Sequence, residues 1–304
     1  MIQIKKWKIG LFFGLLALAF LSLEAFQEKG LDVPYVPTPV KVVEAMLAMA
    51  EVSKDDILYD LGCGDGRIVI SAARDYGTQG VGIDLDPQRI KECHENAITA
   101  GVEDHVQFFQ TDLFEADFSE ASVVALYLLT ENNLRLRPKF LKELIPGSRI
   151  VSHDYDMGRW KADKEILIEE DWEIHAVYFW IVPANVSGTW TWSMPTESGN
   201  KTFTLNLEQY FQHVSGEAFE NNLLRPISIT ERKIIGNTFA FIMERKQEKS
   251  SEWLIFEGRV DGHSMVGTVK TKGSKNSKKW KAKRKPGTQV SIYSPEQDPL
   301  FFSR

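Results

Sequence analysis

Short apolar runs alternate with segments of helical periodicity in the first half of the chain. Apolar residues cluster at positions 57–59, 81–83, 106–110, 122–129 and 149–153. Between the runs, apolar residues recur at the three- and four-residue spacing of an amphipathic helix. Strands that alternate with helices predict βαβ units around a mostly parallel sheet. We therefore expect an α/β fold with a doubly wound sheet in this half of the chain.

Polar residues and prolines mark where the helices begin. Thr38 is a candidate cap for a helix that starts at Pro39. A second helix is expected over residues 86–100, with Asp86 as its cap, and a third over residues 137–144. No full-length helix follows the run at 149–153, and the sheet is expected to close with a hairpin of residues 165–169 and 173–182.

From residue 183 onward the alternation of apolar and polar residues has a period of two. Glycine-containing turns recur at hairpin spacing between the runs, which predicts an antiparallel meander of seven or eight strands, either a small barrel or a sandwich. The runs are 189–194, 201–207, 211–217, 237–244, 253–260, 264–270 and 278–283. The expected divisions are a hydrophobic segment at 1–30, an α/β domain at 31–182, an antiparallel β domain at 183–288 and a tail at 289–304.

A glycine-rich loop follows the first apolar run. Residues 60–66 read Asp-Leu-Gly-Cys-Gly-Asp-Gly and precede a helical pattern. A dinucleotide fingerprint, Gly-x-Gly-x-x-Gly, fails here because Arg67 or Val69 stands where its third glycine is needed. A P-loop is excluded because no Gly-Lys-Ser/Thr follows. The loop therefore belongs to a nucleotide-type ligand of another kind, held in a Rossmann-like sheet.

Acidic residues end the next two strands. Asp84 follows the run at 81–83, where a carboxylate can accept hydrogen bonds from a ribose diol, and Asp112 follows the run at 106–110. With the glycine loop, this pattern resembles the class I S-adenosylmethionine-dependent methyltransferases. The resemblance implies S-adenosylmethionine as cofactor and Asp112 as the group that contacts the adenine amino group. It implies further cofactor-binding residues in the loop, namely Asp60, Gly62, Gly64 and Gly66.

A narrower resemblance covers residues 33–155. The segments Val-Pro-Tyr-Val-Pro and Asp-Leu-Gly-x-Gly-Asp-Gly-Arg-Ile-Val are similar to those of the mitochondrial lysine methyltransferases that modify the ATP synthase c subunit and the adenine nucleotide translocase. The resemblance implies a protein lysine as methyl acceptor. That family usually has Glu and Asn where this chain has Asp84 and Asp86.

Methyl transfer to an amine needs alignment more than it needs a nucleophilic side chain, and the sequence contains no nucleophile triad. An amine must still lose a proton, so groups at the strand ends are candidate catalytic residues. The Asn-Pro-Pro-Tyr signature of enzymes that methylate nucleobases or glutamine is absent. No metal site is predicted, because the histidines are scattered and Cys63 and Cys93 read as buried fillers. The catalytic candidates are Tyr127, Glu131, His153, Asp154 and Asp156.

The amino-terminal segment predicts a location at or beyond a membrane. Three lysines precede an uncharged stretch at residues 9–23, which is short for a membrane span and within the range of a signal-peptide core. The alternatives are a membrane anchor and a cleaved signal peptide that leads to export.

Charge adds one candidate contact surface. The net charge is −6, yet residues 270–285 contain nine basic residues and no acid. Such a run reads as a solvated strand face or as a contact with an anionic membrane, and nucleic acid is not expected as a partner. The predicted function is S-adenosylmethionine-dependent methyl transfer to an acceptor that the sequence does not name, with protein lysine favoured by the family resemblance. The alternatives are a lipid or small-molecule methyltransferase and a non-catalytic binding protein that acts through its β domain.

Overall fold

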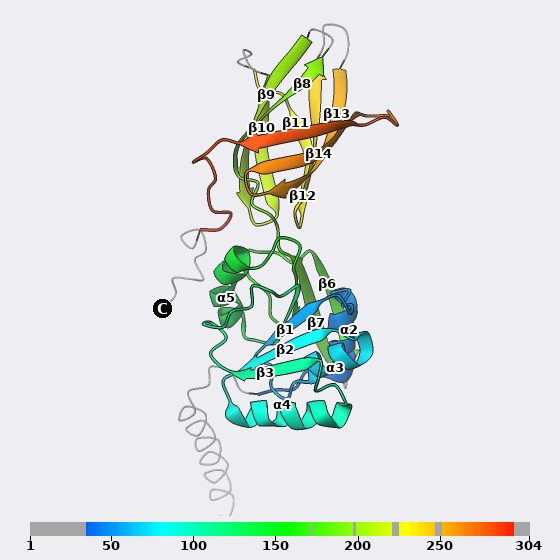
Figure 1. Ribbon diagram of the computed structural model, residues 1–304, viewed down its shortest axis with the longest axis vertical. Helices are drawn as coiled ribbons and strands as arrows, with labels where there is room; N and C mark the ends of the chain where they lie inside the picture. The colour runs from blue at the N-terminus through cyan, green and yellow to red at the C-terminus, as the bar shows by residue number, and fades with distance from the viewer. Residues whose placement is uncertain (1–34, 171, 197–198, 221–224, 247–250, 295–304) are drawn as a thin grey trace, which may run out of the picture.

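A computed structural model describes residues 35–170, 172–196, 199–220, 225–246 and 251–294. Two sheets form two stacked units, with the α/β unit at one end of the molecule and a β unit at the other (Figure 1). The predicted fold class, a doubly wound α/β domain followed by a small antiparallel β domain, is confirmed.

The first sheet has seven strands in the order β3-β2-β1-β4-β5-β7-β6. The five strands β1 to β5 run parallel, and β7 and β6 join antiparallel at one edge. The carboxyl ends of β1 and β4 therefore lie side by side at the point where the chain reverses its direction across the sheet, the usual ligand position in such folds. The strands are β1 Ile57–Leu61, β2 Gln79–Asp84, β3 Val106–Gln110, β4 Val123–Leu126, β5 Arg149–His153, β6 Lys164–Glu170 and β7 Glu173–Ile181.

Helices cover the two faces of this sheet unequally. The helices α2, α3 and α4 contribute to one apolar core, on the face that includes Val123 and Val151. The helix α5 packs on the opposite face, where Trp160, Phe211 and Tyr293 complete the layer. As the sequence predicts, no full-length helix follows β5. The three aromatic residues fill the space beside α5 on this face. The helices are α2 Val40–Met49, α3 Arg67–Tyr76, α4 Pro87–Ala100 and α5 Thr130–Glu143.

The second sheet is an eight-stranded antiparallel meander. Its order is β10-β9-β8-β15-β14-β13-β12-β11, so the terminal strands β8 and β15 pair and each other strand pairs with a sequence neighbour. A bridge between Ala218 and Ile227 brings β10 and β11 together, so the sheet forms a nearly closed barrel. Strand β11 is not among the predicted runs, and several other strands are longer than predicted. The strands are β8 Gly188–Thr196, β9 Gly199–Tyr210, β10 His213–Glu220, β11 Ile229–Ile235, β12 Thr238–Lys246, β13 Ser251–Asp261, β14 Ser264–Thr271 and β15 Lys278–Arg284.

Aromatic side chains fill the interior of the barrel. Trp192 lies at the centre of this group and contacts the rings of Phe203, Phe256 and Trp280 at centroid distances of 5.5, 5.6 and 5.9 Å. Phe241 and Phe256 stack at 4.7 Å. All five side chains are buried, so the barrel has a packed core.

The two units share buried residues. Phe211, which follows β9, is fully buried and stacks on Trp160 of the α/β unit at a centroid distance of 5.8 Å. Arg137 of α5 donates to the hydroxyl of Tyr293 at 3.1 Å. The Gln212 amide donates to the carbonyl of Lys161 at 2.7 Å. Apolar contacts and hydrogen bonds therefore join the units.

Two expected helix starts differ from the structure. Helix α5 begins at Thr130, well before the predicted start at 137, and carries Pro138 inside it. Pro138 disfavours the helical conformation of the residue before it, yet the buried side chains of Leu136 and Phe140 hold the helix together. Helix α2 has Pro39 as its N-cap, with no side-chain capping bond. The hydroxyl of Thr38 bonds instead to the Nδ1 atom of His153, at 3.2 Å.

The predicted localisation is contradicted. Within the described ranges, no helix combines the length and the apolar composition that a bilayer crossing requires. The longest of these helices have 14 residues, against the roughly 20 of a membrane span. Residues 1–30, on which the alternatives of membrane anchor and export rested, lie outside the described residues.

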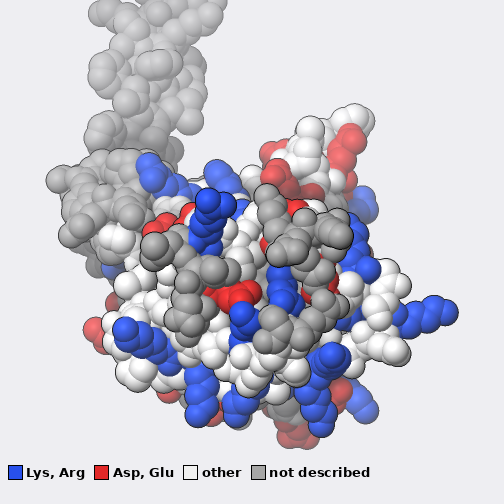
Figure 2. Space-filling view, turned by 90° about the horizontal axis from the view of Figure 1, so that it is seen from above, with Lys and Arg blue, Asp and Glu red and all other residues white. Residues whose placement is uncertain are grey.

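The lysine-rich run at 270–285 comprises the end of β14, a turn and β15, and in β15 the side chains alternate between solvent and core. In β15, Trp280 and Ala282 are buried, whereas the lysines between and beside them are exposed. Figure 2 views the molecule from the end of the β domain, where Lys and Arg side chains project around the rim and acidic groups lie both near the middle and at the edges. The charged face is therefore solvated, as one of the two predictions had it, and membrane contact gains no support from these residues.

Candidate active site

The glycine-rich loop after β1 is held in a backbone conformation that suits glycine. Gly62, Gly64 and Gly66 have φ values of 83°, 55° and 80°. A Cβ atom on Gly62 would lie 2.9 Å from the Leu128 side chain, and one on Gly64 would lie 2.5 Å from the ring of Tyr35. The loop therefore has neither the conformational freedom nor the space for side chains at these positions.

A cavity of about 380 Å³ opens beside this loop, at the carboxyl ends of β1, β2 and β4. It brings together all the predicted cofactor residues except Gly66, which lies behind the loop against Cys93 and Phe108. Acids at the ends of β1, β2 and β3 thus contribute to one cavity, as the sequence predicts. Its wall includes Asp60, Gly62, Gly64, Asp84, Asp112, Tyr127, Asn132 and Tyr155.

Asp60 is a buried acid without a cationic partner among the described residues. It is 2% exposed, and no described residue hydrogen-bonds its carboxyl group. Burial, together with the neighbouring charges of Asp84 and Asp65, raises the pKa of Asp60 to about 8. An acid in this position favours a positively charged ligand, because a cation would offset both the cost of burying the ionised carboxylate and its repulsion by the neighbouring acids.

Asp84 joins the glycine loop to the start of α4. One carboxylate oxygen accepts the N–H of Gly64 at 2.9 Å, and the other accepts the N–H of Asp86 at 2.9 Å. Burial raises the pKa of Asp84 despite these bonds. Both oxygens keep lone pairs beside the cavity. Asp112 lies on the same wall, and its carboxylate accepts the N–H of Phe114 at 2.8 Å.

The segment 35–39 crosses the glycine loop and is called the strap below. Arg67, the first residue of α3, forms a two-pronged ion pair with Asp65, at 2.9 and 2.7 Å, and donates to the carbonyl of Thr38 at 2.8 Å. The Arg89 guanidinium lies 4.5 Å from the centre of the Tyr35 ring. Arg67 thus connects the strap to the loop, and Tyr35 covers the cavity. Sequence analysis assigned no site role to these residues.

The five catalytic candidates occupy different positions around the cavity. Tyr127 lines it, and burial raises the pKa of Tyr127 to about 12. The fully buried His153 stacks behind Tyr127 at a centroid distance of 3.8 Å, and burial lowers the pKa of His153 to about 4. Asp154 lies beside His153, at 3.1 Å from its Nε2 atom. Glu131 and Asp156 are not among the residues of the cavity wall.

The segment after β5 adds a residue that sequence analysis missed as a site residue. Tyr155 lines the cavity, and its carbonyl accepts hydrogen bonds from Ser152 at 2.7 Å and from Asn133 at 3.0 Å. The Asn133 side chain is fully buried. The polar and aromatic character of residues 153–158 is a signal that could have identified Tyr155. The Asn133 amide could not be identified, because helix α5 was predicted to start after it, at residue 137.

The residues present fit an adenosyl sulfonium. The loop offers bare backbone, the unpaired Asp60 favours a cation, and carboxylates stand where ribose and adenine groups need acceptors. The fold and the site together define an S-adenosylmethionine-dependent methyltransferase.

Comparisons with known proteins agree with this class. Residues 60–164 match the family described as the ANTKMT methyltransferase domain. The chain is 46% identical over 151 residues to a protein-lysine N-methyltransferase of Saccharolobus islandicus, covering 49% of this chain and 94% of that protein. It is 33% identical over 133 residues to the lysine N-methyltransferase of the ATP synthase c subunit from Xenopus laevis, covering 44% of this chain and 58% of that protein. The chain belongs to this family of S-adenosylmethionine-dependent methyltransferases.

One solved structure is also similar. It is described as an RNA methyltransferase from Salinibacter ruber in complex with S-adenosyl-L-homocysteine. The two chains are 53% identical, with 50% of this chain and 96% of the other covered, and the TM-score is 0.48. The matched regions of these relatives each span about half of this chain or less.

Proposed function

We propose that this methyltransferase modifies the ε-amino group of lysine in a protein substrate. The observation that carries the proposal is the 46% identity to a protein-lysine N-methyltransferase over 94% of that protein's length. The aromatic wall of the cavity agrees with it, because the rings of Tyr127 and Tyr155 can line the alkyl chain and face the ammonium group of a lysine.

The cofactor-binding roles follow from position. When bound, S-adenosylmethionine supplies a methyl group that its sulfonium already activates. The backbone of Gly62 and Gly64 would hold the methionine part, with Asp60 offsetting its positive charge. Asp84 would accept the ribose hydroxyls, and Asp112 would accept the adenine amino group. Gly66 would serve the turn itself, as the N-cap residue directly before α3.

The acceptor end needs a neutral amine held in line with the methyl group. Tyr127 stays protonated at neutral pH because its pKa is raised to about 12, so its role is to orient the acceptor. Removal of the lysine side chain from water in the cavity disfavours its charged form and lowers its pKa, which eases the loss of the proton to water. His153 and Asp154 lie behind Tyr127 and are not needed as bases in this scheme.

The test is methyl transfer from isotope-labelled S-adenosylmethionine into a cell lysate. Protein, RNA, lipid and small-molecule fractions are separated, and hydrolysed protein is searched for labelled methyl-lysine. The expected result is label in N-methyl-lysine. Label confined to RNA, lipid or small molecules would overturn the lysine proposal and leave the enzyme class intact.

A matched pair of variants tests the site. Asp84→Asn should reduce kcat/KM for the cofactor by about 10- to 100-fold, the equivalent of one hydrogen bond to a charged group. Asp117→Asn is the control, because Asp117 also accepts a backbone N–H two residues further on, from Ser119, but is exposed and away from the cavity. Equal activity of the two variants would count against the assigned role of Asp84.

We also propose that residues 31–182 act as the catalytic domain and residues 183–288 as an accessory domain. Two separate sheets and two separate cores support this division. The segment 289–304 is proposed as a tail, although Ile292 and Tyr293 within it are buried. The accessory domain lies outside the residues 60–164 that match the methyltransferase domain.

A further inference from the structure

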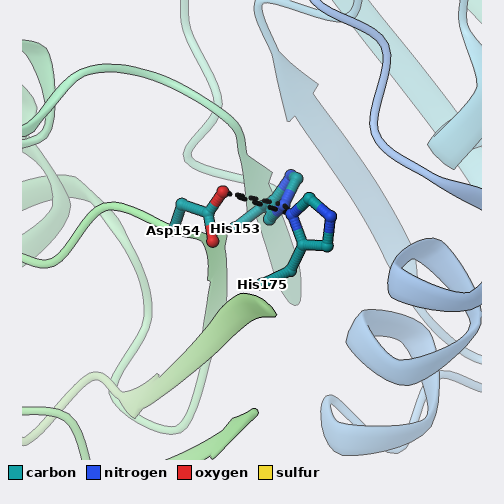
Figure 3. Close-up of side chains that lie close together, drawn as sticks. All are labelled: His153, Asp154 and His175. Carbon is teal, nitrogen blue, oxygen red and sulfur yellow. Dashed lines mark hydrogen bonds and ion pairs between the residues drawn. The ribbon is translucent and has the colours of Figure 1, made fainter. Parts of the chain in front are cut away.

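Three side chains converge behind the wall of the cofactor cavity, at the end of β5 and the start of β7. They are His153, Asp154 and His175, whose nitrogen and oxygen atoms point toward one another in Figure 3. The Nε2 atom of His153 lies 2.9 Å from Nδ1 of His175 and 3.1 Å from Oδ2 of Asp154. The third side of the triangle, from His175 Nδ1 to Asp154 Oδ2, measures 3.4 Å.

These three distances are those of ligands around a single small cation. Zinc binds imidazole nitrogen and carboxylate oxygen at about 2.0–2.2 Å with tetrahedral geometry. Ligand atoms at such distances stand roughly 3.3 Å from one another, which follows from the tetrahedral angle. An ion slightly above the triangle would therefore reach all three atoms with little movement of the side chains.

In His153 and Asp154 the second polar atom has a hydrogen-bond partner of its own. Nδ1 of His153 meets the Thr38 hydroxyl at 3.2 Å, and the other carboxylate oxygen of Asp154 accepts the N–H of Ala176 at 2.8 Å. Nε2 of His175 lies 3.9 Å from the Glu173 carboxylate. Such outer partners are typical of metal ligands, because they fix the tautomer and orientation of the ligand.

One tautomer of each histidine suits a cation at the centre. A neutral imidazole has one N–H, and when the outer nitrogens of His153 and His175 carry it, the inner nitrogens present lone pairs. Two lone pairs and a carboxylate oxygen then face one another at hydrogen-bond distance. A positive ion converts this repulsion into attraction.

We propose that His153, Asp154 and His175 bind one divalent transition-metal ion of the zinc class. Two imidazoles and one carboxylate suit zinc and its first-row neighbours. The ion would join β5 to β7 and, through Thr38, to the strap over the cofactor cavity. Three protein ligands leave a fourth position, which water can occupy because the Asp154 side chain is 30% exposed.

The experiment uses the full chain without a histidine tag, freed of metal with a chelator. Calorimetric titration with Zn²⁺ measures stoichiometry and affinity, and Co²⁺ absorption between the near-ultraviolet and the red reports the coordination. Thermal unfolding with and without Zn²⁺ gives a third readout. None of these depends on methyl transfer, so their outcome is independent of the proposed lysine activity.

Two substitutions remove ligands with little disturbance of the fold. Asp154 has a φ of 57°, a conformation that Asn tolerates, and Asp154→Asn keeps an acceptor for the Ala176 N–H. His175→Gln removes the second ligand. The control is His213→Gln, an exposed histidine at the start of β10.

The expected result is one Zn²⁺ per wild-type chain, with a rise in the unfolding temperature. Asp154→Asn and His175→Gln should weaken binding by more than the roughly 10- to 100-fold that the loss of an outer partner costs. His213→Gln should bind as the wild type does. Failure of the wild type to bind Zn²⁺ at a one-to-one ratio, or unchanged affinity in both ligand variants, would overturn the proposal.

Discussion

Carboxyl groups around the glycine loop differ in how their charge is balanced. Asp65 is paired with Arg67, which holds its pKa below the usual range against the opposing effect of burial. Asp60 lies deeper and has no such partner among the described residues. Ionising Asp60 without a ligand therefore costs free energy, and a cationic ligand relieves that cost.

The first prediction concerns the pH dependence of stability. Since the pKa of Asp60 rises from 3.8 to about 8 on folding, the folded chain holds more protons than the unfolded chain between these values. Its free energy of unfolding therefore decreases as the pH rises through this window. Without ligand, the free energy of unfolding of Asp60→Asn should exceed that of the wild type by a margin that grows by up to about 4 kcal/mol from pH 5 to pH 8. Each pH unit in this window contributes about 1.4 kcal/mol.

Urea unfolding of both proteins at pH 5 and pH 8 measures this difference. At pH 5 the advantage of the variant should be smallest, because the wild-type carboxyl group is protonated in the folded state. A difference between the two proteins that does not change with pH would show that Asp60 is ionised in the fold.

The second prediction concerns Gly64. In Gly64→Ala the new Cβ would lie 2.5 Å from the ring of Tyr35 at a φ of 55°, so the loop or the strap must shift. We expect cofactor affinity to fall by at least about 10-fold, equivalent to 1.4 kcal/mol. Gly101→Ala is the control, since Gly101 also has a positive φ but its Cβ would meet nothing within 4 Å. Equal loss of affinity in both variants would contradict the steric argument.

At this scale the sequence predicted the residues whose position follows from strand order. Asp60, Asp84 and Asp112 each end a strand, so the sheet alone brings them to one edge. Tyr35 and Tyr155 could not be found in this way, because they reach the cavity through irregular segments. The partners of such segments depend on tertiary hydrogen bonds, such as those from Asn133 and Arg67.

At the scale of elements, the strap and helix α3 act as a unit. The two-pronged contact between Arg67 and Asp65 places the guanidinium so that it also reaches the Thr38 carbonyl. The same Thr38 bonds to His153 at the end of β5. The strap is therefore attached to both sides of the cavity that it covers.

The third prediction tests this attachment. Arg67→Lys keeps the charge but removes the planar fork, so it cannot hold Asp65 and Thr38 together. We expect KM for the cofactor to rise by about 10-fold, because two hydrogen bonds of about 1 kcal/mol each are weakened. Steady-state kinetics at varied cofactor concentration measures the change.

Arg74→Lys is the matched control. Arg74 lies on the same helix and forms the same two-pronged pair, with Asp75, at 2.8 and 2.8 Å, but it is exposed and touches no part of the strap. If both variants raise KM to the same extent, the strap is not held by Arg67.

Helix α5 shows where element boundaries escaped prediction. Pro138 indicated a helix start near residue 137, but the structure begins the helix at Thr130. The first turn contains Asn132 and Asn133, buried residues of low helix propensity, and the Asn133 amide donates to the carbonyl of Tyr155 in a neighbouring segment. Tertiary contacts therefore override local preference there, and a single sequence does not reveal them. By contrast, α4 has a capping Asp and a terminal Gly, and its range was predicted correctly.

At the scale of the whole molecule, the β domain completes a core of the α/β domain. Phe211 and Tyr293 pack with Trp160 over the face of the sheet that also carries α5. The sequence predicted the barrel from its period-two alternation but not this docking, because Trp160 and Phe211 lie in connections between strands and Tyr293 follows the last described strand.

The fourth prediction is that the two units unfold together. Phe211 is fully buried and stacks on Trp160 and Tyr293, so Phe211→Ala should cost about 3–5 kcal/mol. It should also divide one calorimetric transition into two. Phe239→Ala, which removes an equally buried ring inside the barrel, should lower the unfolding temperature and leave a single transition. Two transitions in the wild type would contradict shared cooperativity.

The packed interior of the barrel has a consequence for how this domain can evolve and act. Wide barrels of this topology enclose guests, but here tryptophan and phenylalanine rings already take up the lumen. A binding partner of this domain must therefore contact its outer surface. The charged residues of that surface can be substituted without repacking the barrel core.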